Sequence, residues 1–116
     1  MNIKKAQEQI HATAVKKGWW DEKILNGAII PRSIGDQFTN FHSEISEAWE
    51  KYREGMPMDH VYFEGGKPEG IGIELADCII RILDTCGEYG IDIEYCIKLK
   101  MKYNKNRPYR HGNKLA

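Results

Sequence analysis

The amino-acid sequence predicts an all-α protein that forms a single domain over residues 1–116. A chain of 116 residues has an ordinary length for one domain. Apolar residues recur at helical spacing in four segments, and glycine and proline residues separate these segments. No run of residues alternates between apolar and polar for long enough to predict a β-strand.

The first part of the chain is predicted to hold a helix, a connector and the start of a second helix. The first helix covers about residues 2–17 and ends at Gly18. Residues 18–32 complete this N-terminal part, residues 1–32, and form a connecting segment that is anchored by apolar side chains. Ser33 or Asp36 is expected to cap the second helix, because short polar side chains accept hydrogen bonds from the first free backbone N–H groups.

The second part of the chain is predicted to hold two more helices. The second helix runs to about Glu54, and the glycine- and proline-rich residues 55–70 form a loop. A third helix covers about residues 71–89, and a fourth covers about residues 92–106. Residues 107–116 are expected to form a short basic tail.

Composition excludes several classes of protein. The chain carries 17 basic and 17 acidic residues, and a neutral chain is a poor candidate for a general nucleic-acid-binding protein. No segment approaches the roughly 20 apolar residues that span a bilayer. The first residues lack the apolar run of a signal peptide, and three cysteines, an odd number, suit a reducing compartment. We therefore expect a cytoplasmic protein. We also expect that it binds neither a membrane nor a nucleic-acid polymer.

The neutral total hides an uneven distribution of charge. Residues 1–35 carry a net charge of +3, residues 36–90 carry −8, and residues 91–116 carry +5. The acidic middle and the basic end predict either two surface patches with different functions or a mixed solvated surface.

The second predicted helix combines an apolar face with two carboxylates at its edge. Its apolar side chains fall within an arc of about 100° and are expected to face the core: Phe38, Phe41, Ile45, Ala48, Trp49 and Tyr52. Glu44 lies at the edge of this face, and Glu47 follows one turn later. The pattern E-x-x-E therefore places two carboxylates beside the apolar seam.

The third predicted helix is apolar around much of its circumference but carries one narrow polar stripe. Its apolar residues spread over about 220°, so we expect it to be buried on several sides, within the domain or by a second subunit. The stripe consists of Glu74, Asp77, Arg81, Asp84 and Glu88.

Two interpretations of this stripe are open. In the first, it is the solvent-facing edge of the helix, and Arg81 pairs with an acid on the same helix. In the second, Glu74 and Asp77 face the E-x-x-E pair within a core formed by residues 33–106, and a divalent cation lies between the two helices. Magnesium and manganese prefer such oxygen ligands, and unpaired carboxylates near a core are costly.

The two acidic motifs, in this order, resemble the signature of the all-α nucleoside triphosphate pyrophosphohydrolases, among them the MazG-like proteins. The motifs consist of Glu44 and Glu47, then Glu74 and Asp77. The stretch KPEGIGIELADCIIRILD at 67–84 is similar to the second metal helix of MazG-like proteins. The stretch KMKYNKNRPYRHGNK at 100–114 is similar to their C-terminal part. The resemblance covers about residues 36–114.

This resemblance implies a four-helix bundle that a partner subunit completes, in a homodimer or a homotetramer. It implies that the protein hydrolyses a nucleoside triphosphate to a monophosphate and pyrophosphate, with Mg²⁺ or Mn²⁺ as the cofactor. The implied metal ligands are Glu44, Glu47, Glu74 and Asp77, and Glu47 is also the candidate to position or deprotonate the attacking water. The implied contacts to substrate phosphate are Lys100, Asn104, Arg107 and Lys114. The first three share one face of the predicted fourth helix, which also fits a solvated helix face.

One position departs from the family pattern. The family usually carries E-E-x-x-E in its first motif, but Ser43 stands where the first acid is expected. The missing carboxylate would help to hold a second ion or to orient a water. This departure motivates one alternative to a general enzyme, a metal- or nucleotide-binding sensor with little or no turnover. Two further alternatives are open: an interaction module whose acidic stripe meets a basic tail, and a pyrophosphohydrolase restricted to one nucleotide, such as dUTP or a damaged nucleotide.

Overall fold

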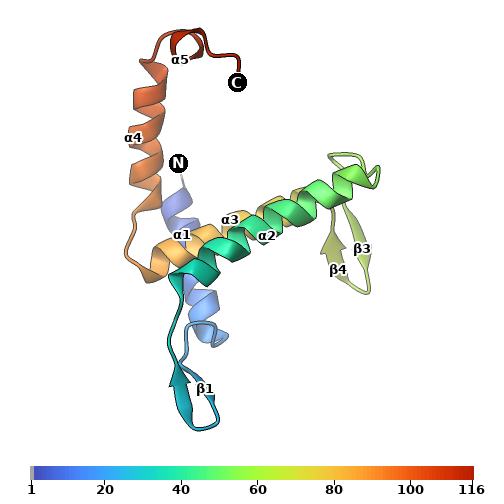
Figure 1. Cartoon of the computed structure of the whole chain (residues 1–116), viewed down its shortest axis with the longest axis vertical. Helices are drawn as coiled ribbons and strands as arrows, with labels where there is room; N and C mark the ends of the chain where they lie inside the picture. The colour runs from blue at the N-terminus through green and yellow to red at the C-terminus, as the bar shows by residue number, and fades with distance from the viewer. Residues whose placement is uncertain (1) are drawn as a thin grey trace.

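The computed structural model describes residues 2–116, and it is mostly helical. Figure 1 shows the arrangement of its helices, which are α1 (Ile3–Lys16), α2 (Ile34–Arg53), α3 (Ile71–Glu88), α4 (Ile93–Lys105) and α5 (Arg110–Asn113). The first four agree with the helices predicted from the sequence within a few residues. The side chain of Ser33 accepts a hydrogen bond from the backbone N–H of Asp36, which confirms the predicted cap of α2.

The prediction that the chain contains no strand is wrong. The structure contains two antiparallel hairpins, formed by β1 (Lys23–Leu25) with β2 (Ala28–Ile30) and by β3 (Tyr62–Glu64) with β4 (Lys67–Glu69). The first lies in the segment expected to be a connector, and the second lies in the segment expected to be a loop. Each strand is three residues long, which is too short for an alternating pattern to stand out.

Both hairpins turn through two residues that adopt positive φ. Asn26 and Gly27 have φ of 52° and 80°, and Gly65 and Gly66 have φ of 58° and 81°. Asn-Gly and Gly-Gly favour this tight turn because asparagine tolerates a positive φ and glycine adopts it without steric cost. These dipeptides are the sequence signal that predicts the hairpins.

The centre of the molecule is the pair formed by α2 and α3. The two helices run side by side in opposite directions, and α1 crosses α3 (Figure 1). The buried apolar residues lie on α2 and α3, namely Ala48, Ile71, Cys78, Leu83 and Cys86. The thiol of Cys78 also donates a hydrogen bond to the backbone carbonyl of Phe41 at 3.5 Å, so the two helices approach closely where the acidic motifs lie.

Two glycines allow the close approaches that position α3. Gly70, directly before the helix, has a φ of 144°, and a Cβ atom there would lie 2.3 Å from the carbonyl oxygen of His60. Gly87, near the end of the helix, faces α1, and a Cβ atom there would lie 2.6 Å from Cγ of His11. Neither position has room for a larger residue without a backbone shift.

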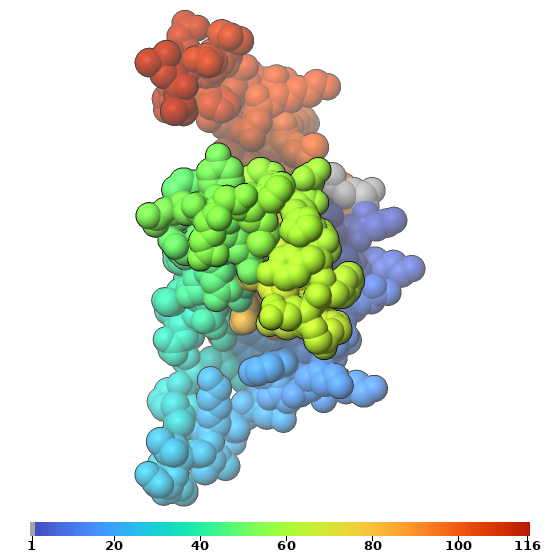
Figure 2. All heavy atoms as spheres, turned by 90° about the vertical axis from the view of Figure 1, so that its right-hand side faces the viewer, coloured from blue at the N-terminus to red at the C-terminus, as the bar shows by residue number. Residues whose placement is uncertain are grey.

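Helix α4 leaves this centre as a separate arm, so one chain does not form a four-helix bundle by itself. In Figure 1 it extends away from the α2–α3 pair, and in Figure 2 the orange and red C-terminal segment stands clear of the green centre. Its base is held to α1, because Oε1 of Glu94 accepts hydrogen bonds from the backbone N–H groups of Ile3 at 3.0 Å and Lys4 at 3.3 Å. The N–H groups of Lys4 and Ile3 lower the pKa of Glu94, since they favour its charged form.

The predicted core face of α2 is mostly exposed in the single chain, contrary to the sequence-based expectation. Of its six apolar residues only Ala48 is buried, and Trp49 is 56% exposed. On α3, Leu75, Ile79 and Ile80 are also exposed. The radius of gyration is 17.7 Å, against roughly 13 Å for a compact chain of this length. A single chain therefore leaves much of its apolar surface in contact with solvent.

Among residues 2–116, no helix combines the length and the apolar character that crossing a membrane requires.

Candidate metal centre

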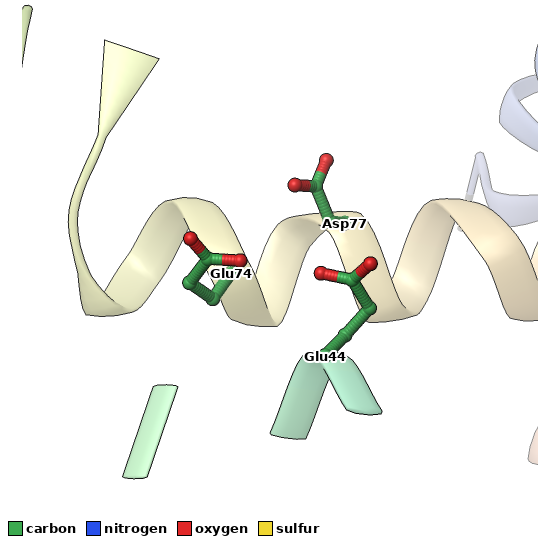
Figure 3. Close-up of side chains that lie close together, drawn as sticks. All are labelled: Glu44, Glu74 and Asp77. Atoms are coloured by element: carbon green, nitrogen blue, oxygen red, sulfur yellow. The ribbon is translucent and has the colours of Figure 1, made fainter. Parts of the chain in front are cut away.

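Three of the four predicted carboxylate ligands meet between α2 and α3. Glu44 rises from α2 toward Glu74 and Asp77 of α3, as Figure 3 shows. One carboxylate oxygen from each of the three residues lies within 4.8 Å of the others. The two acidic motifs, which lie about 30 residues apart in the sequence, therefore form one cluster. This geometry supports the interpretation in which the motifs face each other, rather than the one in which the whole stripe faces solvent.

Two of these carboxylates are buried. Glu44 and Glu74 are each only 8% exposed, whereas Asp77 is exposed. Within the part of the chain that the structure describes, Oε2 of Glu44 is buried without a hydrogen-bond partner. An unpaired buried carboxylate oxygen is costly, and a cation, or a proton held by a neighbouring acid, offsets this cost.

Glu74 has a strongly perturbed acidity. Burial, followed by the neighbouring carboxylates of Glu47 and Glu44, raises its pKa from 4.5 to about 7. The ammonium group of Lys51 acts in the opposite direction. Such a perturbed acid beside other acids is typical of a functional site, because crowded negative charges need a cation or a proton.

Glu47, the fourth predicted ligand, lies on the open side of the cluster. It is exposed, and it lines a hollow of about 330 Å³ together with Glu50, Glu54 and Glu74. Its carboxylate acts on the acidity of Glu74, so the two side chains are neighbours. The structure therefore brings all four predicted ligands into one region, with Glu47 accessible to solvent.

Two basic side chains flank the cluster, and the sequence did not predict their contacts. Nε of Arg81 donates a hydrogen bond to Oε1 of Glu44 at 2.9 Å. Nζ of Lys51 lies 3.9 Å from Oε1 of Glu74 and 3.6 Å from Oε2 of Glu69 on β4. The interpretation of the stripe as a solvent-facing edge pairs Arg81 with an acid on its own helix, but its partner lies on α2. Helical spacing cannot reveal such contacts, because they depend on how two helices are placed.

The second half of the acidic stripe has a different role from the first half. Oδ1 of Asp84 contacts Nδ1 of His11 at 2.8 Å and accepts a hydrogen bond from Nε1 of Trp20 at 2.9 Å. Glu88 forms an ion pair with Arg32 at 2.9 Å. These contacts join α3 to α1 and to the segment around β1 and β2. The stripe thus divides into a carboxylate cluster and a structural network.

A cavity of about 430 Å³ opens beside the cluster, between α1, α2, α3 and β1. Its walls combine aromatic, amide and basic side chains with two acids of the stripe: Trp19, Trp20, Gln37, Asn40, Lys17, Lys23, Arg81, Asp77 and Asp84. Asp77 and Arg81 therefore belong to the wall of this cavity and also border the carboxylate cluster. A volume of this size suits a small organic ligand.

The predicted phosphate contacts do not lie at this cluster within one chain. Lys100 and Asn104 are on α4, Arg107 follows it, and Lys114 lies after α5. The arm begins beyond the C-terminal end of α3, whereas Glu74 is in the first turn of α3, about 20 Å away along the helix. The basic residues that do line the neighbouring cavity are Arg81, Lys17 and Lys23.

Ser43 contributes no ligand to the cluster. Its hydroxyl group donates a hydrogen bond to the backbone carbonyl of Thr39 at 3.1 Å, one turn earlier in α2. The side chain is therefore occupied by its own helix, and the position adds no negative charge.

A comparison of the chain with models of known families, with curated proteins and with solved structures finds no match.

Proposed function

We propose that this protein is a divalent-metal-dependent nucleoside triphosphate pyrophosphohydrolase, similar to the MazG-like enzymes. The observation that carries the proposal is the buried, unpartnered Oε2 of Glu44, which lies in a cluster with Glu74 and Asp77 of the facing helix. Buried acids that are drawn together in this way favour a site for a cation. The MazG-like motifs then suggest which reaction the cation serves.

The donor set fits magnesium, or manganese in its place. All the candidate ligands are carboxylate oxygens, which these ions prefer over softer metals. Neighbouring ligand oxygens around an octahedral magnesium ion lie about 3 Å apart. The observed spacing, within 4.8 Å, needs only small side-chain movements to reach that value. The exposed carboxylate of Asp77 leaves one side of the site open for water and for a phosphate group.

Each residue has a role that follows from its place. Glu44 and Glu74 would hold the ion from the buried side, and Asp77 would hold it from the side of the cavity. When bound, magnesium neutralises charge on the phosphates and activates a water for attack. Glu47 is exposed beside Glu74, so it can orient that water or accept its proton.

The exposed apolar faces of α2 and α3 support a homodimer or a homotetramer. The residues that were expected to form the core remain exposed in one chain, and a second copy would bury them. The same assembly gives a role to the α4 arm. Lys100, Asn104 and Arg107 would reach the phosphates bound at a partner's acidic cluster, where the positive charges of Lys100 and Arg107 complement the phosphates and the amide of Asn104 can donate a hydrogen bond.

We assign this activity to the cytoplasm. Cys78, Cys86 and Cys96 are free thiols, which is typical of a reducing compartment.

A second candidate function is a sensor that binds metal and nucleotide with little turnover. It is supported by Ser43, which stands where the family usually has an additional acid. The hydroxyl of Ser43 donates a hydrogen bond within its own helix and adds no negative charge to the site. A sensor would bind a nucleotide tightly and release almost no pyrophosphate. An interaction module, the third candidate, would assemble in a salt-sensitive way that does not depend on magnesium.

The test is pyrophosphate release from a panel of common and modified nucleoside triphosphates, with magnesium and after chelation. We expect magnesium-dependent release that a Glu74→Gln, Asp77→Asn double variant loses. The matched control is a Glu22→Gln, Glu64→Gln double variant, which removes two exposed acids that do not belong to the cluster. Absence of release from every nucleotide, with metal binding intact, would favour the sensor over the enzyme.

A further inference from the structure

Among the residues that the structure describes, 2–116, Arg81 is the one basic side chain that both contacts the carboxylate cluster and lines the large cavity. Its Nε donates to Oε1 of Glu44 at 2.9 Å, and its side chain also lines the 430 Å³ cavity. The Glu44 side chain is 10% exposed, whereas that of Arg81 is 48% exposed. The pair therefore has a buried end at Glu44 and an open end at the guanidinium group.

Most of the hydrogen-bonding capacity of Arg81 is unused. Among residues 2–116, the contact from Nε to Glu44 is the single hydrogen bond that its guanidinium group makes. The two terminal nitrogens carry four further N–H donors in a planar fork, a geometry that suits the oxygens of a phosphate. Lys17 and Lys23 line the same cavity as Arg81, Asp77 and Asp84, so the lining carries three basic and two acidic side chains and has a small excess of positive charge.

The same guanidinium group competes with a cation for Glu44. Arg81 neutralises Oε1 of this carboxylate, while Oε2 remains unpartnered. A divalent cation at the cluster would place two positive charges next to the guanidinium group, and like charges at such short range repel each other. The repulsion is relieved if the guanidinium group turns outward, toward a negative ligand in the cavity.

We propose that Arg81 is a phosphate-binding residue that serves as the counter-ion of Glu44 until a divalent cation takes its place. Cation binding then directs the guanidinium group to the phosphate chain of a nucleotide in the neighbouring cavity. This inference rests on the proposed function and deepens it, because it assigns a phosphate contact within the same chain as the metal ligands. It also couples metal binding to substrate binding through one side chain.

The proposal predicts opposite effects on two ligands when Arg81 is replaced by glutamine. Mn²⁺ alone should bind about three- to tenfold more tightly, because its competitor for Glu44 is gone. Inorganic tripolyphosphate should bind to the Mn²⁺-loaded protein about tenfold more weakly or worse, since a charge-assisted hydrogen bond is lost. A purely structural role for Arg81 would weaken the binding of both.

The experiment measures free Mn²⁺ by electron paramagnetic resonance and tripolyphosphate binding by calorimetry at saturating Mn²⁺. It compares the wild type with Arg81→Gln, Arg81→Lys and the control Arg53→Gln, which removes a surface charge that is paired with Glu50. Arg81→Lys keeps the charge without the planar fork, so its Mn²⁺ affinity should stay near that of the wild type while tripolyphosphate binding falls several-fold. This variant provides the test if the glutamine variant does not fold.

Weaker Mn²⁺ binding in Arg81→Gln, or unchanged tripolyphosphate binding in both Arg81 variants, would overturn the proposal. The readouts do not depend on turnover. If the protein binds Mn²⁺ and shows the opposite shifts but hydrolyses no nucleotide, the role of Arg81 stands and the enzymatic function fails. If the wild type binds no Mn²⁺, both fail.

Discussion

Glu44 of α2 and Glu74 of α3 place carboxylate oxygens within 4.8 Å of each other, although each residue is only 8% exposed. Two acids in this arrangement cannot both be charged without a cost that a proton or a cation must offset. The pH and metal dependence of the protein should therefore report directly on this pair.

The stability of the metal-free protein should fall as the pH rises. The pKa of Glu74 is raised from 4.5 to about 7, so the folded protein holds this proton more tightly than the unfolded chain does. The stability that this carboxyl contributes is complete below about pH 4.5 and is lost as the pH rises through about 7. Urea unfolding between pH 5 and pH 8 should show a loss of stability in the wild type relative to Glu74→Gln. Parallel profiles for the two proteins would contradict the assigned acidity.

Divalent cations should stabilise the protein at pH 8. Magnesium or manganese at about 100 times its dissociation constant should add about 2.7 kcal/mol to the free energy of unfolding, and a chelator should remove this gain. The Glu74→Gln, Asp77→Asn double variant should gain almost nothing, whereas the Glu22→Gln, Glu64→Gln control should respond like the wild type. If all three proteins gain the same free energy of unfolding from the cation, the ion binds somewhere other than this cluster.

Replacing Ser43 with glutamate should restore the family's additional acid. The side chain is exposed on α2, so the larger residue fits without displacing the core. We expect this variant to bind more Mn²⁺ per chain than the wild type and to release pyrophosphate faster. Thr39→Glu adds the same charge one turn earlier and is the control. If both variants behave like the wild type, the serine does not limit metal binding or turnover.

Self-association should depend on the exposed apolar face of α2. Trp49 is 56% exposed in one chain, and Trp49→Lys should raise the dissociation constant of the oligomer roughly 30-fold or more, as expected for a buried aromatic contact. Sedimentation velocity measures this shift. Trp19→Lys, at a tryptophan that is even more exposed, should leave the oligomer intact. A wild type that is monomeric at micromolar concentration would remove the basis for placing α4 at a partner's site.

The crossing of α1 and α3 should not tolerate a side chain at Gly87. A Cβ atom there would lie 2.6 Å from Cγ of His11, so Gly87→Ala should destabilise the protein by about 1–3 kcal/mol. Gly72→Ala, in the same helix, meets no atom within 4 Å and should instead stabilise it slightly, by about 0.5 kcal/mol. Chemical denaturation of both variants provides the comparison. Equal effects would show that α1 does not pack on α3 as observed.

The helices could be predicted from the sequence because their signals are local. Apolar periodicity located α1 to α4, and of the two predicted caps of α2, Ser33 and Asp36, the structure shows Ser33. The hairpins were missed because their strands are only three residues long, although Asn26-Gly27 and Gly65-Gly66 were readable turn signals. The direction of α4 was not predictable, since it depends on contacts such as that between Glu94 and the start of α1 rather than on helical spacing.

The candidate site could be predicted only in part for a similar reason. The i, i+3 spacing of Glu74 and Asp77 brings them to one side of α3, and the order of the two motifs suggested that Glu44 would meet them. Spacing within a helix does not reveal which charge lies across the interface. The contact between Arg81 and Glu44 was therefore missed, and the phosphate-binding role predicted for Lys100 could not be placed in the same chain.

The most direct test of the proposed metal centre is the anomalous diffraction of crystals grown with Mn²⁺. We predict a strong anomalous peak between the carboxylates of Glu44, Glu74 and Asp77, and loss of this peak in the Glu74→Gln, Asp77→Asn variant. Ordered Mn²⁺ elsewhere with none at this cluster, or a cluster that stays empty at millimolar Mn²⁺, would contradict the assignment of these residues as a metal centre.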